Sequence, residues 1–333
     1  MSDMKPVEKR DFLFDNMRLF LIFWVVTGHL LELFMKGNAF YTALHAVIYS
    51  FHMPLFVFVS GYFTKSTKKS RRDSIGTLLI PYLLFTTAAS AISGTLTPAS
   101  LFTPQYAFWY FLSLFYWRFF SGLFKKPRLL LPLSILLALM AGLVPQINRF
   151  LGLSRTLVFL PFFLMGMCWS AEDTKRIRRV PKALATAGAV CCAVCTALLS
   201  LLNIVPNELY RQAQSYADSG LSNGAGLLFR SISLLIASAM IFAAVNLTPD
   251  KETKFSYIGQ RTVTIFALHA LLVVLVKRLF PDFLYTAARS PLILPAVLLL
   301  SAACIWIFSR KHVVSAYKHI FGFFPLIFEK KKK

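Results

Sequence analysis

Residues 17–35 have the sequence MRLFLIFWVVTGHLLELFM, in which only Arg18 and Glu32 carry a formal charge. A helix of this length is about 28 Å long, close to the thickness of the hydrocarbon core of a bilayer. The stretch therefore predicts a transmembrane helix, and similar apolar runs recur along the chain. The ten expected spans are residues 17–35, 40–63, 75–93, 107–124, 129–144, 156–169, 183–205, 225–245, 262–276 and 291–308.

The composition excludes other classes of protein. Of the 333 residues, 57% are apolar and only 15% are charged, which is too apolar for a soluble domain. The net charge of +22 raises the question of nucleic-acid binding. However, the cations lie in short clusters between apolar runs, so we expect the lipid bilayer as a partner and no nucleic acid. The predicted fold is an all-α polytopic membrane protein.

The cations also predict how the chain is oriented. If the N-terminus is cytoplasmic, ten spans place 26 Lys and Arg residues on the cytoplasmic side and seven on the other side. Cytoplasmic loops carry the excess of Lys and Arg, so both termini are expected in the cytoplasm. We expect one transmembrane domain over residues 1–333 with its core at 11–309. Residues 310–333 are expected to form a basic cytoplasmic tail that lies at the membrane interface.

The first span carries the most informative polar residues. Arg18 and His29 are eleven residues apart, so they share one helix face, with a rise of about 16 Å between them. Glu32 follows His29 at i+3 and is within reach of the imidazole, whose tautomer it would fix. Ionisable groups inside spans predict function. Simpler alternatives are a packed histidine, an arginine that reaches the headgroups and a glutamate that reaches the outer surface.

Further polar residues lie in the other spans. Arg118 in the fourth span is level with Arg18, so the two could flank one anionic ligand. His52 and His269 are either packed or functional. Trp109 fits an interfacial aromatic belt or a platform for a sugar ring. Arg71 and Arg72 suit phosphate binding or orientation signalling, and Arg155 suits carbohydrate contact or solvation.

The motifs that carry a family resemblance run from about residue 11 to 270. They are residues 15–18 (DNMR), 28–29 (GH), 51–56 (FHMPLF), 60–62 (SGY), 108–112 (FWYFL), 117–118 (WR), 154–156 (SRT), 159–163 (FLPFF), Gly166, 258–259 (IG), Thr264 and 268–269 (LH). With these motifs the chain resembles the acyltransferase 3 family of integral membrane acyltransferases, in its fucose 4-O-acetylase-like branch. The combination of Arg-x10-His with Ser-Gly-aromatic is the specific part.

The resemblance implies transfer of an acyl group, usually acetyl from acetyl-CoA, to a carbohydrate hydroxyl at the bacterial cytoplasmic membrane. In the family, the residues that match Arg18 and His29 are required for activity. Tyr62 stands where the family has phenylalanine, and the adjacent Arg71 and Arg72 replace an Arg-x-x-Arg element. We expect acyl-CoA as donor substrate, no tightly bound cofactor and no metal. The expected partners are a carbohydrate acceptor and proteins of glycan synthesis.

The expected site divides into three groups. The catalytic group is His29, Glu32 and Arg18. The acyl-CoA group is Asp15, Arg18, Arg71, Arg72 and Arg118. The acceptor group is His52, Ser60, Tyr62, Trp109, Arg155 and His269.

Two mechanisms remain open for His29, which acts either as a general base or as an acyl-accepting nucleophile. A different class of function uses the same residues. In a transporter or flippase of glycan intermediates, the intramembrane Arg, His and Glu form a proton relay or bind the cargo. A non-catalytic scaffold for polysaccharide synthesis would tolerate changes at Arg18, His29 and Ser60.

Overall fold

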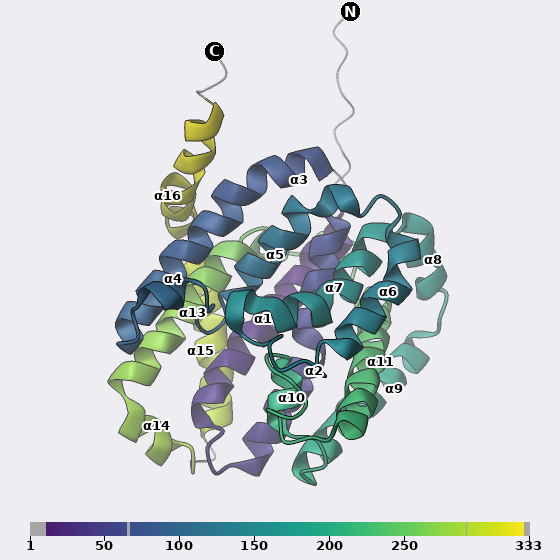
Figure 1. Ribbon diagram of the computed structural model, residues 1–333, viewed down its shortest axis with the longest axis vertical. Coiled ribbons are helices and arrows are strands. Elements are labelled where there is room, and N and C mark those ends of the chain that lie inside the picture. Colours follow the sequence, from purple (N-terminus) through teal and green to yellow (C-terminus); the bar gives the residue numbers. More distant parts are fainter. Residues whose placement is uncertain (1–10, 65–66, 291, 330–333) are drawn as a thin grey trace, which may run out of the picture.

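The computed structural model describes residues 11–64, 67–290 and 292–329, and all regular structure in these ranges is helical (Figure 1). This confirms the predicted all-α class. The helices are α1 (Phe12–Leu31), α2 (Ala39–Tyr62), α3 (Thr67–Ser74), α4 (Ile80–Ser93), α5 (Trp109–Phe119), α6 (Pro127–Met140), α7 (Leu153–Cys168), α8 (Ala171–Arg178), α9 (Lys182–Leu201), α10 (Asn207–Arg211), α11 (Asn223–Leu247), α12 (Ser256–Gly259), α13 (Thr262–Leu279), α14 (Pro281–Ala287), α15 (Ile293–Phe308) and α16 (Lys311–Glu329). A π-helical turn, Ile75–Leu79, joins α3 to α4.

Among the described residues, seven helices are long and apolar enough to cross a membrane. The number is eight if α15 and α16, which meet at a bend of 62°, form one broken span. Three of the ten expected spans correspond to helices that are too short to be among these seven: α5 has 11 residues, α6 has 14 and α15 has 16. An apolar run also includes the turns that flank a helix, so hydropathy alone overestimates the length of these helices. The structure supports a multi-pass membrane protein, and the exact number of spans stays a prediction.

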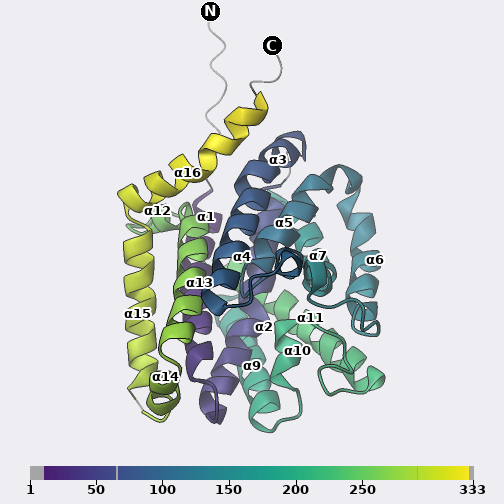
Figure 2. The same ribbon diagram turned by 60° about the vertical axis from the view of Figure 1, so that its left-hand side comes forward.

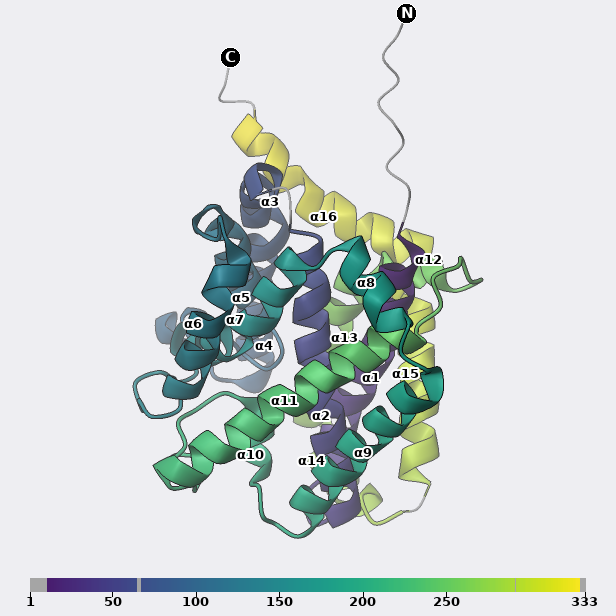
Figure 3. The ribbon, with the colours of Figure 1, turned by 90° about the vertical axis from the view of Figure 1, so that its right-hand side faces the viewer.

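Helices α1 and α2 form the centre of the bundle. Helix α1 packs against α2, α13 and α15, whereas α2 packs against α7, α9 and α11. Figures 2 and 3 show the other long helices around this pair, with α11 and α9 crossing α2 on one side. Helix α9 is mostly exposed along its length, as expected for a helix that faces lipid. The central position of α1 places its Arg18 and His29 in the interior.

Two glycines allow α2 and α7 to touch through their backbones. A Cβ atom at Gly61 would lie 2.1 Å from the Phe163 carbonyl oxygen, and one at Gly166 would lie 2.0 Å from the Phe58 carbonyl oxygen. Small residues at a membrane helix interface permit this close approach. The Ser-Gly-aromatic motif and Gly166 are therefore packing features as well as sequence markers.

The start of α1 is fixed by side chains of its own motif. The Asn16 amide nitrogen donates to the carbonyl oxygens of Pro249 and Lys251, both at 2.9 Å, and the Asn16 side-chain oxygen accepts from Ser256 at 2.6 Å. Helix α16 crosses the same end of the bundle (Figure 2). The predicted tail includes Lys330–Lys333, which lie outside the described residues.

Candidate active site

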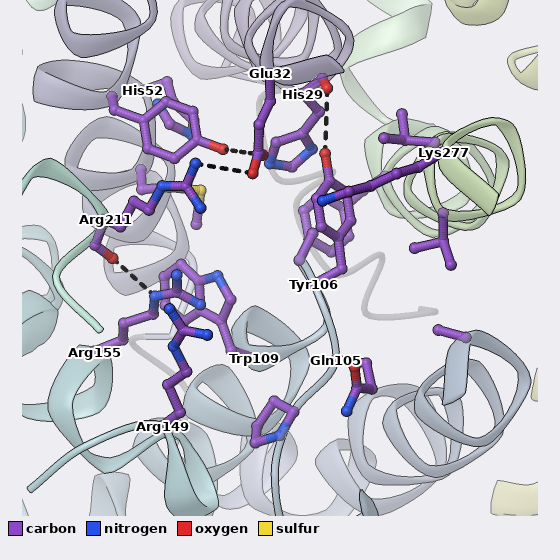
Figure 4. Close-up of a pocket in the computed structure, with 18 of the residues that line it drawn as sticks. His29, Glu32, His52, Gln105, Tyr106, Trp109, Arg149, Arg155, Arg211 and Lys277 are labelled. Carbon is purple, nitrogen blue, oxygen red and sulfur yellow. Dashed lines mark hydrogen bonds and ion pairs between the residues drawn. The ribbon is translucent and has the colours of Figure 1, made fainter. Parts of the chain in front are cut away.

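A cavity of about 410 Å³ is lined by His29, and we call it the His29 cavity. Figure 4 shows residues of its lining. Its walls come from α1, α2, α4, α5, α7, α10, α13 and the segment before α5. The lining residues with polar or aromatic side chains are His29, Glu32, Tyr49, His52, Ser93, Gln105, Tyr106, Trp109, Arg149, Arg155, Phe159, Tyr210, Arg211, Phe266, Lys277 and Arg278.

The hydrogen bonds of His29 determine which ring nitrogen is available for chemistry. Nδ1 of His269 lies 2.8 Å from the Ile265 carbonyl oxygen, which can only accept, so this nitrogen carries the proton. In a neutral His269 ring, Nε2 is then an acceptor, and it lies 2.9 Å from Nδ1 of His29. His29 therefore donates through Nδ1, and its Nε2 keeps a free lone pair. A buried imidazole held in this way suits a general base or a nucleophile.

Glu32 does not hold the imidazole as the sequence had suggested. Its carboxylate forms an ion pair with Arg211 at 3.1 Å and accepts from the Tyr49 hydroxyl at 3.5 Å (Figure 4). The partner of His29 is instead His269 on α13. The physical reason is that Glu32 begins a 3₁₀ turn, Glu32–Phe34, and α10 brings a guanidinium to that turn.

Tyr106 fixes the end of α1 from the opposite wall. Its hydroxyl donates to the His29 carbonyl oxygen at 3.2 Å (Figure 4). Burial, together with the negative charge of Glu32, raises the pKa of Tyr106 well above its ordinary value, so the hydroxyl stays a donor. Tyr106 has a φ of 49°, which is unfavourable for a residue with a side chain. Such strain is often retained at functional sites because it holds a group in place.

The Ser154, Arg155 and Thr156 motif places α10 at the cavity. The Ser154 hydroxyl donates to the Gln212 carbonyl oxygen, and Nε of Arg155 donates to the Arg211 carbonyl oxygen, both at 2.9 Å. The guanidinium of Arg155 also lies over the Trp109 ring, 4.9 Å from its centre. The motif thus supplies one lining cation and positions a second.

A second cavity, of about 480 Å³, lies toward α16 and is called the Arg18 cavity. Its described lining includes four cationic residues, Arg18, Arg118, Arg261 and Lys318, and no acidic residue. Arg18 lies 3.8 Å from the Asp15 carboxylate and stacks over the Phe63 ring at 4.0 Å. The structure therefore brings Arg18 and Arg118 to one site, as their depths in the sequence suggested. Such a set of cations suits a polyanionic ligand such as one with phosphate groups.

The two cavities meet at one aromatic side chain. Phe266 on α13 lines both of them and is buried. Its ring contacts Tyr110 at 5.4 Å between centroids and His269 at 5.8 Å. Phe266 is thus the partition between the His29 cavity and the Arg18 cavity.

The other predicted site residues lie in different places. His52 lines the His29 cavity, and Ser60 lines the Arg18 cavity, where its hydroxyl is 2.6 Å from that of Tyr110. Asp15 supports this region by accepting from the Gln260 amide at 3.2 Å.

Five predicted residues line neither cavity: Asp15 and His269, which contact lining residues, and Tyr62, Arg71 and Arg72. Tyr62 donates to Asp11 at 3.0 Å and stacks on Phe14. Arg71 and Arg72 are exposed on α3, where Arg71 stacks on Phe119 and Arg72 pairs with Asp73.

Several lining residues were not predicted from the sequence, among them Tyr49, Tyr106, Arg211, Phe266 and Lys277. One signal was available. Cations are rare on the side predicted to be outside, so each cation there was a candidate for the site. The aromatic residues gave no such signal in a chain with 33 Phe and 12 Tyr.

The fold and the two cavities define a polytopic membrane protein with two neighbouring cationic pockets and a buried histidine in the wall of one of them. The chain belongs to the acyltransferase 3 family: the family model described as an acyltransferase domain matches residues 12–310. It is 39% identical over 85 residues to the nodulation protein NolL of Sinorhizobium fredii, a stretch that covers 23% of this chain and 23% of that protein. No solved structure gives a significant match. The protein is therefore a membrane acyltransferase, and the family predicted from the motifs is confirmed.

Proposed function

We propose that this acyltransferase transfers an acetyl or another short acyl group from cytoplasmic acyl-CoA to a hydroxyl of a carbohydrate outside the bacterial cytoplasmic membrane. The observation that carries the proposal is the position of His29 in the wall of one cavity, which shares Phe266 with a second, cationic cavity. The Arg18 cavity, at the end where both described termini lie, is the donor site. Its four cationic residues would hold the phosphates of the coenzyme.

The free Nε2 of His29 supports two routes, and both use the same lone pair. As a base, Nε2 takes the proton of the sugar hydroxyl while the oxygen attacks the thioester carbonyl carbon. The carbon–sulfur bond then breaks, and the leaving thiolate of CoA takes up the proton from the imidazolium. As a nucleophile, Nε2 itself attacks the thioester, releases CoA and passes the acyl group to the sugar oxygen, whose proton is released.

The proposal is tested with purified protein in nanodiscs and acetyl-CoA labelled in the acetyl group. We expect label on glycan prepared from the envelope of cells that lack the protein. A transporter or flippase would instead move glycan across a vesicle membrane without transferring label. Absence of acetyl transfer together with glycan transport would refute the proposal.

His269 is a positioning residue in this account, because it acts through His29. We expect His269→Ala to lower kcat about 10- to 100-fold, a part of the contribution of a well-positioned base, with the KM for acetyl-CoA unchanged. His269→Gln should restore part of kcat because its side-chain oxygen can accept from Nδ1 of His29. Steady-state kinetics of the three proteins test this. Equal kcat losses in both variants would contradict the positioning role.

Phe266 is expected to keep water away from the thioester. We expect Phe266→Ala to raise the hydrolysis of acetyl-CoA to acetate and CoA several-fold when no acceptor is present, because loss of the ring widens the passage through which water from the His29 cavity reaches the thioester. Phe266→Leu keeps most of the side-chain volume and should give a smaller increase. A release assay for free CoA measures the effect. Unchanged hydrolysis in a folded Phe266→Ala protein would show that Phe266 is not the partition.

A further inference from the structure

The His29 cavity collects most of the positive charge at its end of the molecule. The sequence places seven Lys and Arg residues on the side predicted to be outside, and five of them line this cavity. The five are Arg149, Arg155, Arg211, Lys277 and Arg278. Cations are sparse on that side, so their concentration at one cavity is not a general property of the surface.

The acidic residues do not balance this charge. Glu32 is the one acidic residue in the described lining, and its carboxylate is bound to Arg211. Among the described residues, Arg149, Arg155, Lys277 and Arg278 have no carboxylate within ion-pair distance. Figure 4 shows Arg149 beside Arg155 at one side of the cavity and Lys277 reaching toward Tyr106 from the other. Two walls of the cavity therefore present cations that an anion could bind.

The remaining two cations of this side provide a comparison. Lys36 and Arg289 do not line the cavity, and each lies over the ring of Tyr285, at 5.6 and 5.7 Å from its centre. Their positions are explained by contact with this aromatic ring near the surface. No such contact explains Arg149, Lys277 or Arg278 among the described residues.

We propose that the acceptor bound in the His29 cavity is an anionic glycan, with a phosphate or carboxylate group close to the hydroxyl that is acylated. This inference rests on the proposed function and adds the chemical class of its acceptor. Guanidinium groups bind phosphate and carboxylate oxygens with paired hydrogen bonds, and Lys277 adds a point charge. Tyr106 in the same walls adds an aromatic side chain for contact with the sugar ring.

The test compares three probes that differ in one group: methyl glucoside, methyl glucuronide and methyl glucoside 6-phosphate. Their binding to the full-length protein in nanodiscs is measured by calorimetry. We expect at least one anionic probe to bind about tenfold or more tightly than methyl glucoside, and this advantage to shrink in about 0.5 M sodium chloride because salt screens the charges. Stronger binding of the phosphate or of the carboxylate probe identifies which group the cavity prefers.

Two double variants give the matched comparison. Arg149→Gln with Lys277→Gln should remove most of the preference for the anionic probes, whereas Lys36→Gln with Arg289→Gln should keep it. Equal binding of all three probes, or the same preference in both double variants, would overturn the inference. Hydrolysis of acetyl-CoA without acceptor is measured on the same samples and on His29→Ala. If it still depends on His29 while the probes bind equally, the anionic acceptor is wrong and the acyltransferase function stands.

Discussion

Replacement of His29 by alanine is expected to lower acetyl transfer at least about 100-fold, and up to about 10⁴-fold, which is the usual contribution of a positioned general base. The loss is expected in kcat, because the proposed donor site is the Arg18 cavity, whose lining the change leaves intact. The rate of label transfer from acetyl-CoA to envelope glycan measures it. Either route for His29 requires its free Nε2, so the prediction does not depend on the choice between base and nucleophile.

His312→Ala is the matched control for this change. His312 lies on the outward face of α16, outside both main cavities. We expect this variant to transfer acetyl at the rate of the unmodified protein. A folded His29→Ala protein with near-normal transfer would refute the role of His29, and equal losses in the two histidine variants would show that the effect is not specific.

Gly166→Ala is expected to destabilise the folded protein by at least about 3 kcal/mol, at the upper end of the usual cost of overpacking. The added methyl group would lie 2.0 Å from the Phe58 carbonyl oxygen and 2.8 Å from the Tyr62 nitrogen. Both are backbone atoms, so α2 and α7 must separate, and no side chain can rotate away. The yield of folded protein in detergent and its thermal midpoint measure the effect.

Gly188→Ala on α9 provides the comparison. A Cβ atom at Gly188 meets nothing within 4 Å, and alanine is the better helix former by about 1 kcal/mol. We expect this variant to be as stable as the unmodified protein or slightly more stable. If Gly166→Ala behaved in the same way as Gly188→Ala, the direct backbone contact between α2 and α7 would be contradicted.

The arrangement along α1 could be predicted because it depends on local geometry alone. A spacing of eleven residues puts Arg18 and His29 on one helix face at two depths. In the structure, they line two different cavities that α1 contributes to. The polar residues inside apolar runs could be found for the same reason. Their interpretation as one site relied on the family resemblance.

The partners of these residues could not be predicted from spacing. His29 and His269 are 240 positions apart, and their contact exists because α13 packs against α1. Glu32 is within reach of His29 along the chain, but Arg211 on α10 offers a full opposite charge. Tertiary packing determines which partner each of these side chains contacts. The role proposed for Phe266 could not be predicted either, because it depends on two cavities that both reach its ring.

The central claim is that His29 joins a donor cavity on one side of the membrane to an acceptor cavity on the other. It is tested most directly in proteoliposomes with the protein in one known orientation and labelled acetyl-CoA only on the side of the chain termini. The account predicts acetylated glycan when the envelope glycan is present only on the opposite side, and none with His29→Ala. Product that forms only when donor and glycan are on the same side would contradict it.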